Sequence, residues 1–347
     1  MAGRRERGAA VTGSAGRLSL RLNNDLTVGQ FTDLAAAADE AGFDQVWVSH
    51  DLFWRSAPVL VAAASAATRR IMLGIGIMNP FSAHPAELAM HAATLQEASG
   101  GRFMLGLGSG AAEFLAWAGL PRPRPLAAAR GALLACRALL GGGSPADEPQ
   151  LAADGWQPEA HLRWSGPPVP LYLGAMGPKM LALGGELADG VLGLSFPPER
   201  AAASADVVRS AAARAGRDPA AVDVPACFWC SVDDDPERAA APLAEKLAYY
   251  GPSISAVQLA DAGLSPADFG PAAAALERGE AALARRLITA PMLRLGIVGD
   301  SAAVIARCRD LASGGATHLS FGPPLGPDPV AAVQRLGRDV LPALRAG

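Results

Sequence analysis

The feature of this sequence that most restricts its fold is a repeated unit, in which an Ala- and Leu-rich helix is followed by a glycine and a short apolar strand. In the first unit, Thr27 precedes the helix and Gln30 follows three residues later, which is the spacing of a capping box. Gly42 can take the left-handed conformation that ends such a helix, and residues 45–49 then form a strand. The unit recurs at residues 178–194 and 301–321. Helices that alternate with strands in this way predict βα units and a parallel sheet.

Eight apolar segments qualify as strands: residues 17–22, 45–49, 70–77, 102–107, 169–174, 190–194, 222–232 and 316–321. Eight strands separated by helices favour an α/β fold of the closed (β/α)8 TIM-barrel type, and a six-stranded open sheet is the alternative. The 347 residues fit one barrel domain over 17–347. Residues 1–16 are rich in Gly, Ala, Arg and Ser without a continuous apolar stretch, so we expect a disordered tail and no signal peptide.

Two connections are too long for simple crossovers. Residues 141–166, after the fourth helix, are rich in Gly, Pro and acidic residues. Residues 233–294 contain short helical patterns broken by Gly-Pro and Ser-Pro pairs. We therefore expect insertions after strands 4 and 7, and insertions in barrels often cover the carboxyl-terminal mouth, where the chemistry takes place.

Composition excludes several functions. A net charge of -3 without basic clusters argues against nucleic-acid partners and membrane surfaces, and no apolar run is long enough to span a membrane. A chain with a large core needs no disulfides, so its four cysteines are consistent with the cytoplasm. Cys227 and Cys230 form a C-x-x-C motif within an apolar strand, where they are expected to be core residues. The histidines lack the spacing of metal ligands, so we expect no metal.

Candidate functional residues follow the strands. Ser49-His50-Asp51 follows the second, and an imidazole beside a carboxylate can bind and polarise a heterocycle. The third ends Gly74-Ile75-Gly76-Ile77-Met78-Asn79, a pattern that suggests a bulge. The fourth ends Gly106-Leu107-Gly108-Ser109-Gly110. This is not a dinucleotide fingerprint because position 111 is Ala, but its small residues leave room for a planar cofactor.

The fifth strand is followed by Gly174-Ala175-Met176-Gly177-Pro178-Lys179-Met180. Pro178 suits the first position of a helix, whose free backbone amides favour a phosphate. Glu113, shortly after the fourth strand, is a possible proton donor. Trp54, Trp117 and Trp229 are candidates for lining an apolar substrate pocket.

Together these segments resemble the luciferase-like superfamily, and most closely its coenzyme F420-dependent oxidoreductases of the methylenetetrahydromethanopterin reductase type. The resemblance is dense over residues 17–194. It is carried by Asn79-Pro80-Phe81 with His84-Pro85, by Ala93-Thr94-Leu95 with Ser99-Gly100-Gly101-Arg102, by residues 106–110, and by residues 170–180 with Ala188-Asp189-Gly190-Val191.

The resemblance implies a deazaflavin across the barrel mouth, with its phosphate near residues 174–179 and a non-prolyl cis peptide at Gly76–Ile77. The implied cofactor-binding residues are His50, Gly76, Ile77, Met78, Asn79, Gly108, Ser109, Gly174, Ala175, Met176, Gly177, Pro178 and Lys179. Family members often have Asp-His after the second strand, whereas this chain has His50-Asp51. Deazaflavin sugar-phosphate dehydrogenases have Glu where this chain has Ala111. Phosphosugar oxidation is therefore disfavoured, and a proton donor would be Asp51, Glu113 or water.

The sequence thus predicts hydride transfer between coenzyme F420 and a small organic molecule, such as an imine, an activated alkene or a pterin-linked one-carbon unit. One alternative is an FMN-dependent monooxygenase on the same barrel. Another is a catalytically silent paralogue that binds the cofactor. The family also implies a homodimer.

Overall fold

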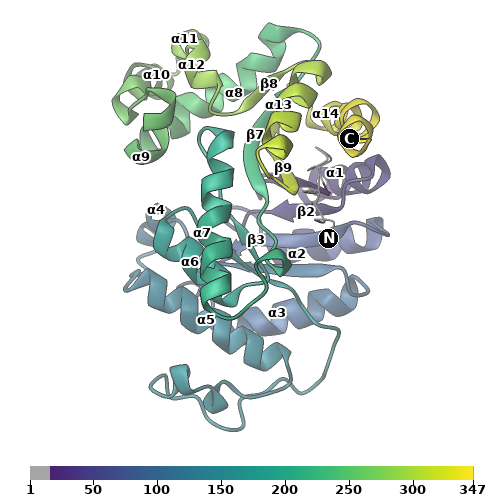
Figure 1. Cartoon of the computed structure of the whole chain (residues 1–347), viewed down its shortest axis with the longest axis vertical. Coiled ribbons are helices and arrows are strands. Elements are labelled where there is room, and N and C mark those ends of the chain that lie inside the picture. The colour runs from purple at the N-terminus through teal and green to yellow at the C-terminus, as the bar shows by residue number, and fades with distance from the viewer. Residues whose placement is uncertain (1–15, 347) are drawn as a thin grey trace, which may run out of the picture.

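The computed structural model describes residues 16–346 and contains a single sheet of parallel strands (Figure 1). Its order is β6-β5-β4-β3-β2-β1-β9-β7-β8, so almost every strand pairs with its neighbour in sequence. The strands are β1 (Arg17–Leu22), β2 (Gln45–Val48), β3 (Met72–Met78), β4 (Phe103–Leu107), β5 (Leu171–Gly174), β6 (Gly190–Leu192), β7 (Ala226–Val232), β8 (Ile297–Gly299) and β9 (His318–Leu325).

The sheet closes between β6 and β7. Two isolated parallel bridges, Gly190 to Asp223 and Leu194 to Cys227, join these segments. The Val191 N–H donates to the Asp223 carbonyl at 2.8 Å. Strands β1–β7 and β9 therefore form the ring, as expected for a barrel, and the alternative of a six-stranded open sheet is wrong.

All eight predicted strands are present, with ends shifted by a few residues. The short strand β8 was not predicted. It pairs only with residues 230–232 of β7, beyond the segment that faces β6. The predicted last strand continues past Phe321 to Leu325, although Pro323 and Pro324 cannot donate ladder hydrogen bonds.

The helices connect the strands. They are α1 (Val28–Ala41), α2 (Ala57–Ala67), α3 (Pro85–Ala98), α4 (Ala112–Trp117), α5 (Pro125–Leu140), α6 (Pro178–Leu187), α7 (Ala201–Arg214), α8 (Pro236–Tyr250), α9 (Ala256–Leu259), α10 (Gly270–Glu277), α11 (Ala281–Leu287), α12 (Ala290–Leu293), α13 (Ser301–Ser313), α14 (Pro329–Arg335) and α15 (Leu341–Arg345). The capping box of Thr27 and Gln30 and the left-handed Gly42 are present as predicted. None of the helices in residues 16–346 has the length and apolar character to span a membrane.

The side chains of β1 show how the barrel is built. Leu18, Leu20 and Leu22 occupy every second position of the strand. Their side chains point out of the barrel into the main core, where they pack with the surrounding helices. Ser19 and Arg21 point the other way, since Ser19 contacts the His318 ring and Arg21 donates to the Phe228 carbonyl. An arginine therefore lies inside the barrel.

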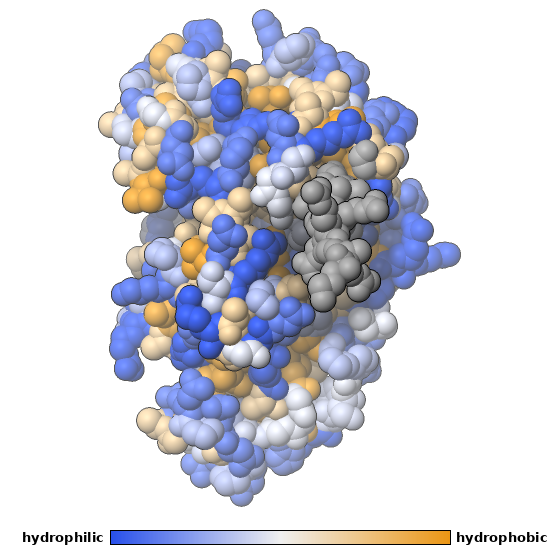
Figure 2. Space-filling view, in the orientation of Figure 1, coloured by the Kyte–Doolittle hydropathy of each residue, from blue (hydrophilic) through white to orange (hydrophobic). Residues whose placement is uncertain are grey.

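Two long connections lie at opposite ends of the molecule (Figure 1). After α5, residues 141–170 form an irregular segment that contains two short 3-10 turns. Between β7 and β8, the helices α8–α12 gather around a separate apolar cluster that includes Trp229, Leu247 and Phe269. The face shown in Figure 2 is mostly hydrophilic, with apolar residues scattered over it. The predicted tail, residues 1–16, lies outside the described residues except for Gly16.

Candidate active site

A cavity of about 730 Å³ lies at the carboxyl-terminal ends of the barrel strands. Residues at the ends of β1, β2, β3, β4, β5 and β6, together with Cys227 and Trp229 within β7 and Pro323 within β9, contribute to its wall. The sequence-predicted residues that line it are His50, Asp51, Gly76, Ile77, Asn79, Ser109, Gly174, Ala175, Met176, Gly177 and Trp229. The ends of β3, β4 and β5 therefore converge on one cavity, as the sequence predicted.

One wall is a bulge in β3. Ile75 pairs with Leu105 and Met78 pairs with Leu107, so β3 has one residue more than β4 over this stretch. The bulge contains Gly76 and Ile77, and the peptide bond between them is cis.

Glycines on the neighbouring strands receive the Ile77 side chain. A Cβ at Gly174 would lie 2.8 Å from Cγ2 of Ile77, and a Cβ at Gly108 would lie 3.1 Å from Cδ1. At Gly106 the same Cγ2 atom would be 3.2 Å away. From the sequence, the space beside Gly108 was predicted to receive a planar cofactor. In the structure, the Ile77 side chain occupies part of that space and forms the surface that faces the cavity.

Asn24 holds the loop after β2. Its side chain is buried and donates to the carbonyl groups of Asp51 and Arg55 at 2.9 and 2.8 Å, and its Oδ1 accepts from the Ser49 hydroxyl. This loop presents His50 and Asp51 to the cavity.

The pKa values of the two titratable groups of this loop are shifted in opposite directions. Burial lowers the pKa of His50, and the neighbouring His91 lowers it further. The His50 Nδ1 accepts from the Ala57 N–H at 3.2 Å, so the neutral ring has its proton on Nε2. Burial raises the pKa of Asp51, as does the nearby Asp25, while Ser49 and Lys246 act in the opposite direction. Asp51 is therefore suited to hold a proton.

The start of α6 forms another part of the wall. Gly177 is the N-cap residue and no side chain caps the helix. Pro178 has no N–H and the Met180 N–H donates to the Gly177 carbonyl, so the amides of Gly177 and Lys179 are the ones that remain for an anion. Across the cavity mouth, Arg122 donates to the carbonyl and the hydroxyl of Ser109 at 2.7 and 2.5 Å. Arg122 also lines the cavity and was not predicted.

Two further cations line the cavity, Arg21 from β1 and Lys246 from α8. The Lys246 Nζ lies 5.1 Å from the centre of the Trp229 ring and 5.0 Å from that of Tyr250. Burial and the charge of Arg21 lower the pKa of Lys246 to about 8. Neither Arg21 nor Lys246 was predicted from the sequence.

Comparisons with known proteins identify the family to which this barrel belongs. Residues 8–318 match the family described as luciferase-like monooxygenase. The chain belongs to that family. It is 30% identical over 309 residues to a 5,10-methylenetetrahydromethanopterin reductase of Methanolobus tindarius, which covers 88% of this chain and 94% of the relative. It is also 31% identical over 350 residues to an F420-dependent glucose-6-phosphate dehydrogenase of Beutenbergia cavernae, covering 94% of this chain and 98% of the relative.

Among solved structures, this family member resembles the coenzyme F420-dependent tetrahydromethanopterin reductase of Methanopyrus kandleri. The TM-score is 0.84 and the identity is 26%, over 95% of this chain and 100% of the other. An F420-dependent secondary alcohol dehydrogenase matches with a TM-score of 0.75 at 21% identity, over 95% of this chain and 99% of the other, which shows the shared fold. These structures support the TIM-barrel prediction.

Some predicted site residues do not line the cavity. Met78 is buried in the main core, and Gly108 contacts Ile77 behind the cavity wall. Pro178 and Lys179 are exposed on α6. Glu113 is exposed in the first turn of α4.

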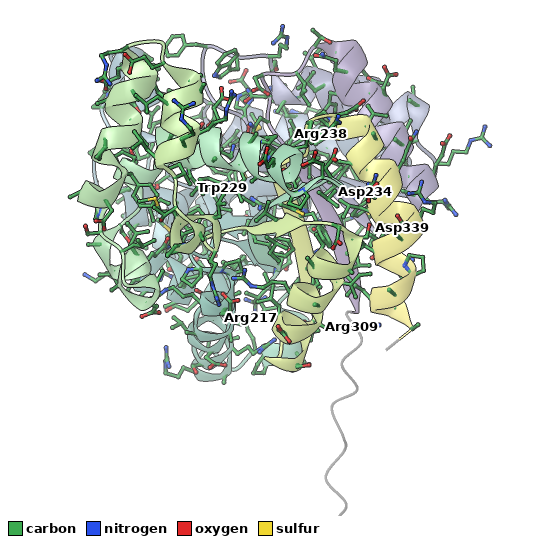
Figure 3. The ribbon with its side chains drawn as sticks, turned by 90° about the horizontal axis from the view of Figure 1, so that it is seen from above. Arg217, Trp229, Asp234, Arg238, Arg309 and Asp339 are labelled. Atoms are coloured by element: carbon green, nitrogen blue, oxygen red, sulfur yellow. The ribbon has the colours of Figure 1, made fainter. Side chains whose placement is uncertain are left out.

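Of the three tryptophans predicted to line the pocket, one lines the cavity and two do not. Trp54 and Trp117 are 57% and 60% exposed and are not among the lining residues, whereas Trp229 is 5% exposed and lines the cavity. Figure 3 shows Trp229 in the interior of the molecule. Its ring packs edge-on against Phe196, with 4.8 Å between the ring centres. Trp54 and Trp117 are therefore surface residues in this structure, because the loop after β2 and helix α4 leave them facing outward.

The cysteines are structural, as predicted. All four are free and buried. Cys227 lies in the barrel interior beside Trp47 and Tyr172, while Cys230 belongs to the core outside the barrel. Two residues three apart on a strand face opposite sides, so this pair does not form a redox centre. Residues 16–346 contain no cluster of side chains that could hold a metal ion.

Proposed function

We propose that this luciferase-like protein is a coenzyme F420-dependent oxidoreductase that transfers a hydride to or from a small organic substrate. An imine, an activated alkene or a pterin-linked one-carbon unit would suit this chemistry. The names of the relatives support the cofactor. The observation that carries the proposal is the cavity wall, in which the Ile77 bulge faces the space between the β2 loop and the uncapped start of α6.

The cavity residues fit such a group. A flat ring needs an apolar surface, which the Ile77 side chain provides, and close backbone approach, which Gly76 and Gly174 permit. A phosphate needs unpaired amides, which the start of α6 provides at Gly177. We assign the ring to Gly76, Ile77 and Asn79, and the phosphate to residues 174–177 with Ser109. When bound, F420 supplies the two-electron hydride chemistry at C5 of its deazaflavin ring.

The protein supplies orientation and proton transfer. In the proposed mechanism, the Asp51 carboxyl holds the proton that the substrate gains or loses, because burial favours its protonated form. Neutral His50 offers its Nε2–H as a hydrogen-bond donor. Trp229 and Tyr250 shield the cavity from water on the α8 side. Glu113 is the second candidate from the sequence, but its exposed position makes it less suited to this role.

The cofactor assignment is tested by titrating the purified protein with F420 and with FMN without oxygen. We expect F420 to bind with at least tenfold higher affinity than FMN. Tight FMN binding, together with oxygen uptake in the presence of reduced FMN and a substrate, would instead support the monooxygenase alternative. Bound F420 without turnover on a panel of reductase and dehydrogenase substrates would support the silent paralogue.

Four further assignments belong to this proposal. We propose that residues 233–294 are an insertion that shapes the substrate side of the cavity, since Lys246 and Tyr250 of α8 line it, and that residues 141–166 are a second insertion. We also propose a homodimer that functions in the cytoplasm. Size-exclusion chromatography with light scattering measures the oligomeric state.

A further inference from the structure

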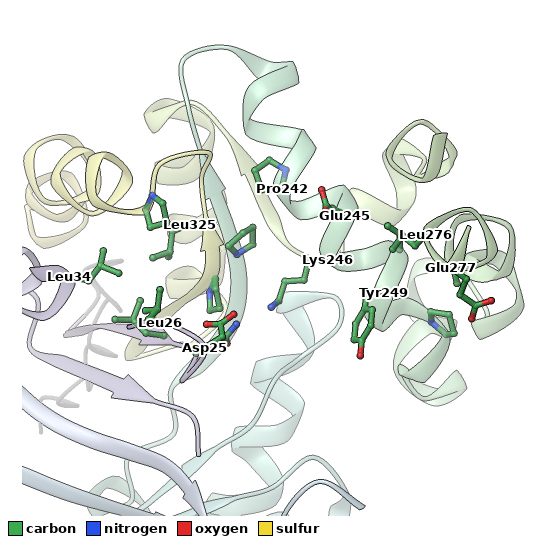
Figure 4. A pocket seen from close by; sticks show the side chains of 18 residues that line it. Asp25, Leu26, Leu34, Pro242, Glu245, Lys246, Tyr249, Leu276, Glu277 and Leu325 are labelled. Atoms are coloured by element: carbon green, nitrogen blue, oxygen red, sulfur yellow. The ribbon is translucent and has the colours of Figure 1, made fainter. Parts of the chain in front are cut away.

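Lysine is rare in this chain. Only two of its 30 basic residues are lysines, Lys179 and Lys246. Lys246 projects from α8 toward the barrel, and Figure 4 shows its amine directed toward the loop that contains Asp25. Lysine differs from arginine in being a compact charge whose pKa responds to burial.

Lys246 lies where two cavities meet. Besides the barrel-mouth cavity, it lines an adjoining cavity of about 940 Å³ between α8, α10 and the ends of β1 and β9. The residues common to both cavities are Leu22, Asn23, Lys246 and Pro323. A molecule at this junction would therefore contact Lys246 and extend into either space.

Arg21 provides a second positive charge in the barrel-mouth cavity. Its guanidinium donates to the Phe228 carbonyl at 2.7 Å. The guanidinium also lies close to Gly322, since a Cβ added there would be only 2.3 Å from Nη2. Its Nε atom is buried and has no hydrogen-bond partner within the described part of the chain. A buried, unpaired donor of this kind is costly unless a ligand satisfies it.

The charges of Arg21 and Lys246 are only partly offset by the acidic groups near them. Within residues 16–346, neither Arg21 nor Lys246 forms an ion pair. Asp25 and Asp51 are near enough to raise the pKa of Lys246, but burial and Arg21 lower it more. The two positive side chains therefore face the same cavity with unused capacity to bind an anion.

We propose that Arg21 and Lys246 form a carboxylate-binding subsite for the substrate, where the barrel-mouth cavity meets the adjoining one. This inference rests on the proposed function and narrows its substrate to a small organic acid. Arginine and lysine donors to a carboxylate make charge-assisted hydrogen bonds, which are stronger than neutral ones.

The adjoining cavity indicates the rest of the substrate. Its walls are largely apolar, with the leucines and prolines Leu22, Leu26, Leu34, Leu276, Leu325, Pro242, Pro252, Pro323, Pro324 and Pro329. Its acidic groups, Asp25, Glu245 and Glu277, would repel a second carboxylate. The preferred ligand is therefore an apolar monocarboxylate, for which benzoate is a suitable probe and benzamide its neutral analogue.

The two lysines make the test specific. Protein labelled with 13C and 15N in lysine gives two side-chain signals, of which Lys179 serves as an internal reference. In the absence of cofactor, benzoate should raise the pKa of Lys246 and shift its signal, while the Lys179 signal stays unchanged. Benzamide should do neither. Benzoate affinity should also fall as the pH rises through 8, because Lys246 then loses its charge while Arg21 keeps it. The other groups near the amine are Asp25, Asp51 and Tyr250.

Variants give a second readout. Lys246→Met keeps an unbranched apolar side chain but removes the amine over the Trp229 ring, and should weaken benzoate binding about tenfold, as loss of one charge-assisted contact predicts. Lys179→Met is the matched control and should leave the dissociation constant unchanged. Arg21→Gln should weaken binding similarly. If Arg21→Gln does not fold, the benzoate affinity of Lys246→Met and the lysine signals of the wild-type protein still test the subsite.

Three results would overturn the subsite. They are equal binding of benzoate and benzamide, an unchanged benzoate affinity in Lys246→Met, and displacement of benzoate by saturating F420, which would place the cations against the cofactor. Failure of the protein to bind F420, with benzoate binding intact, would reject the proposed cofactor and leave the carboxylate subsite standing.

Discussion

Gly174→Ala tests the link between the β3 bulge and ring binding. The new Cβ would lie 2.8 Å from Cγ2 and 3.4 Å from Cγ1 of Ile77, whereas carbon atoms in favourable contact are about 3.5–4.0 Å apart. The Ile77 side chain would have to move. Gly106 also faces Cγ2 of Ile77, and Gly108 faces its Cγ1 and Cδ1, so the open direction is the cavity.

The cost should appear in ligand binding more than in folding. Without ligand, Ile77 can shift into the open cavity, so thermal stability should change little. With a ring against the bulge, that shift is blocked, and overpacking then costs about 1–3 kcal/mol. We expect Gly174→Ala to bind F420 roughly 5- to 150-fold more weakly than wild type.

A double-mutant cycle measured by fluorescence titration checks the reasoning. Ile77→Ala removes the atoms that the new Cβ would strike, so Gly174→Ala should have little further effect in that background. Gly166→Ala is the matched control, because its added Cβ meets nothing within 4 Å. Wild-type affinity in Gly174→Ala, or equal effects of this substitution in both backgrounds, would refute the role of Ile77 as the ring surface.

Three further predictions concern stability and proton transfer. The folded-state pKa of Asp51 is raised, so its charged form is disfavoured in the folded protein. The Asp51→Asn variant should therefore be more stable than wild type at neutral pH and should lose this advantage in acid. The same variant should have a kcat lowered at least about 100-fold. Burial of Asp223 opposes its ionisation, but His318, Tyr172 and Arg17 lower its pKa to about 2. Denaturant titrations should show that about 2 kcal/mol of stability, present above pH 4, is lost as the pH falls toward 2, and Asp223→Asn should lack this loss. Asn24→Ala removes two donors to the β2 loop and should cost about 2 kcal/mol, seen as a Tm lowered by several degrees, with an unchanged Tm as the contrary result.

The sequence was sufficient for the barrel because its signals are local. Strand patterns, the Thr27 capping box and Gly42 each depend on a few adjacent residues, and the structure has them where they were predicted. The convergence of the β3, β4 and β5 ends also followed, since the carboxyl ends of parallel strands in a barrel meet at one mouth.

The direction of side chains in loops could not be predicted. Trp54, Trp117 and Glu113 follow strands closely in sequence, but the loop after β2 and helix α4 leave them exposed. Conversely, Lys246 is distant in sequence from every other cavity residue except Tyr250.

Two signals for the missed cations were nevertheless present. Arg17, Ser19 and Arg21 alternate with leucines along β1, which places an arginine inside the barrel. The rarity of lysine distinguishes Lys246. The homodimer, the cytoplasmic location and the single-domain organisation of residues 17–347 stay predictions.

The most direct test of the account is a crystal structure of the protein with bound F420. The account predicts the deazaflavin ring against Ile77, its phosphate at the start of α6, and Asp51 on the open side of the ring. A ring bound elsewhere on the protein, or turned away from the β3 bulge with its phosphate distant from Gly177, would contradict it.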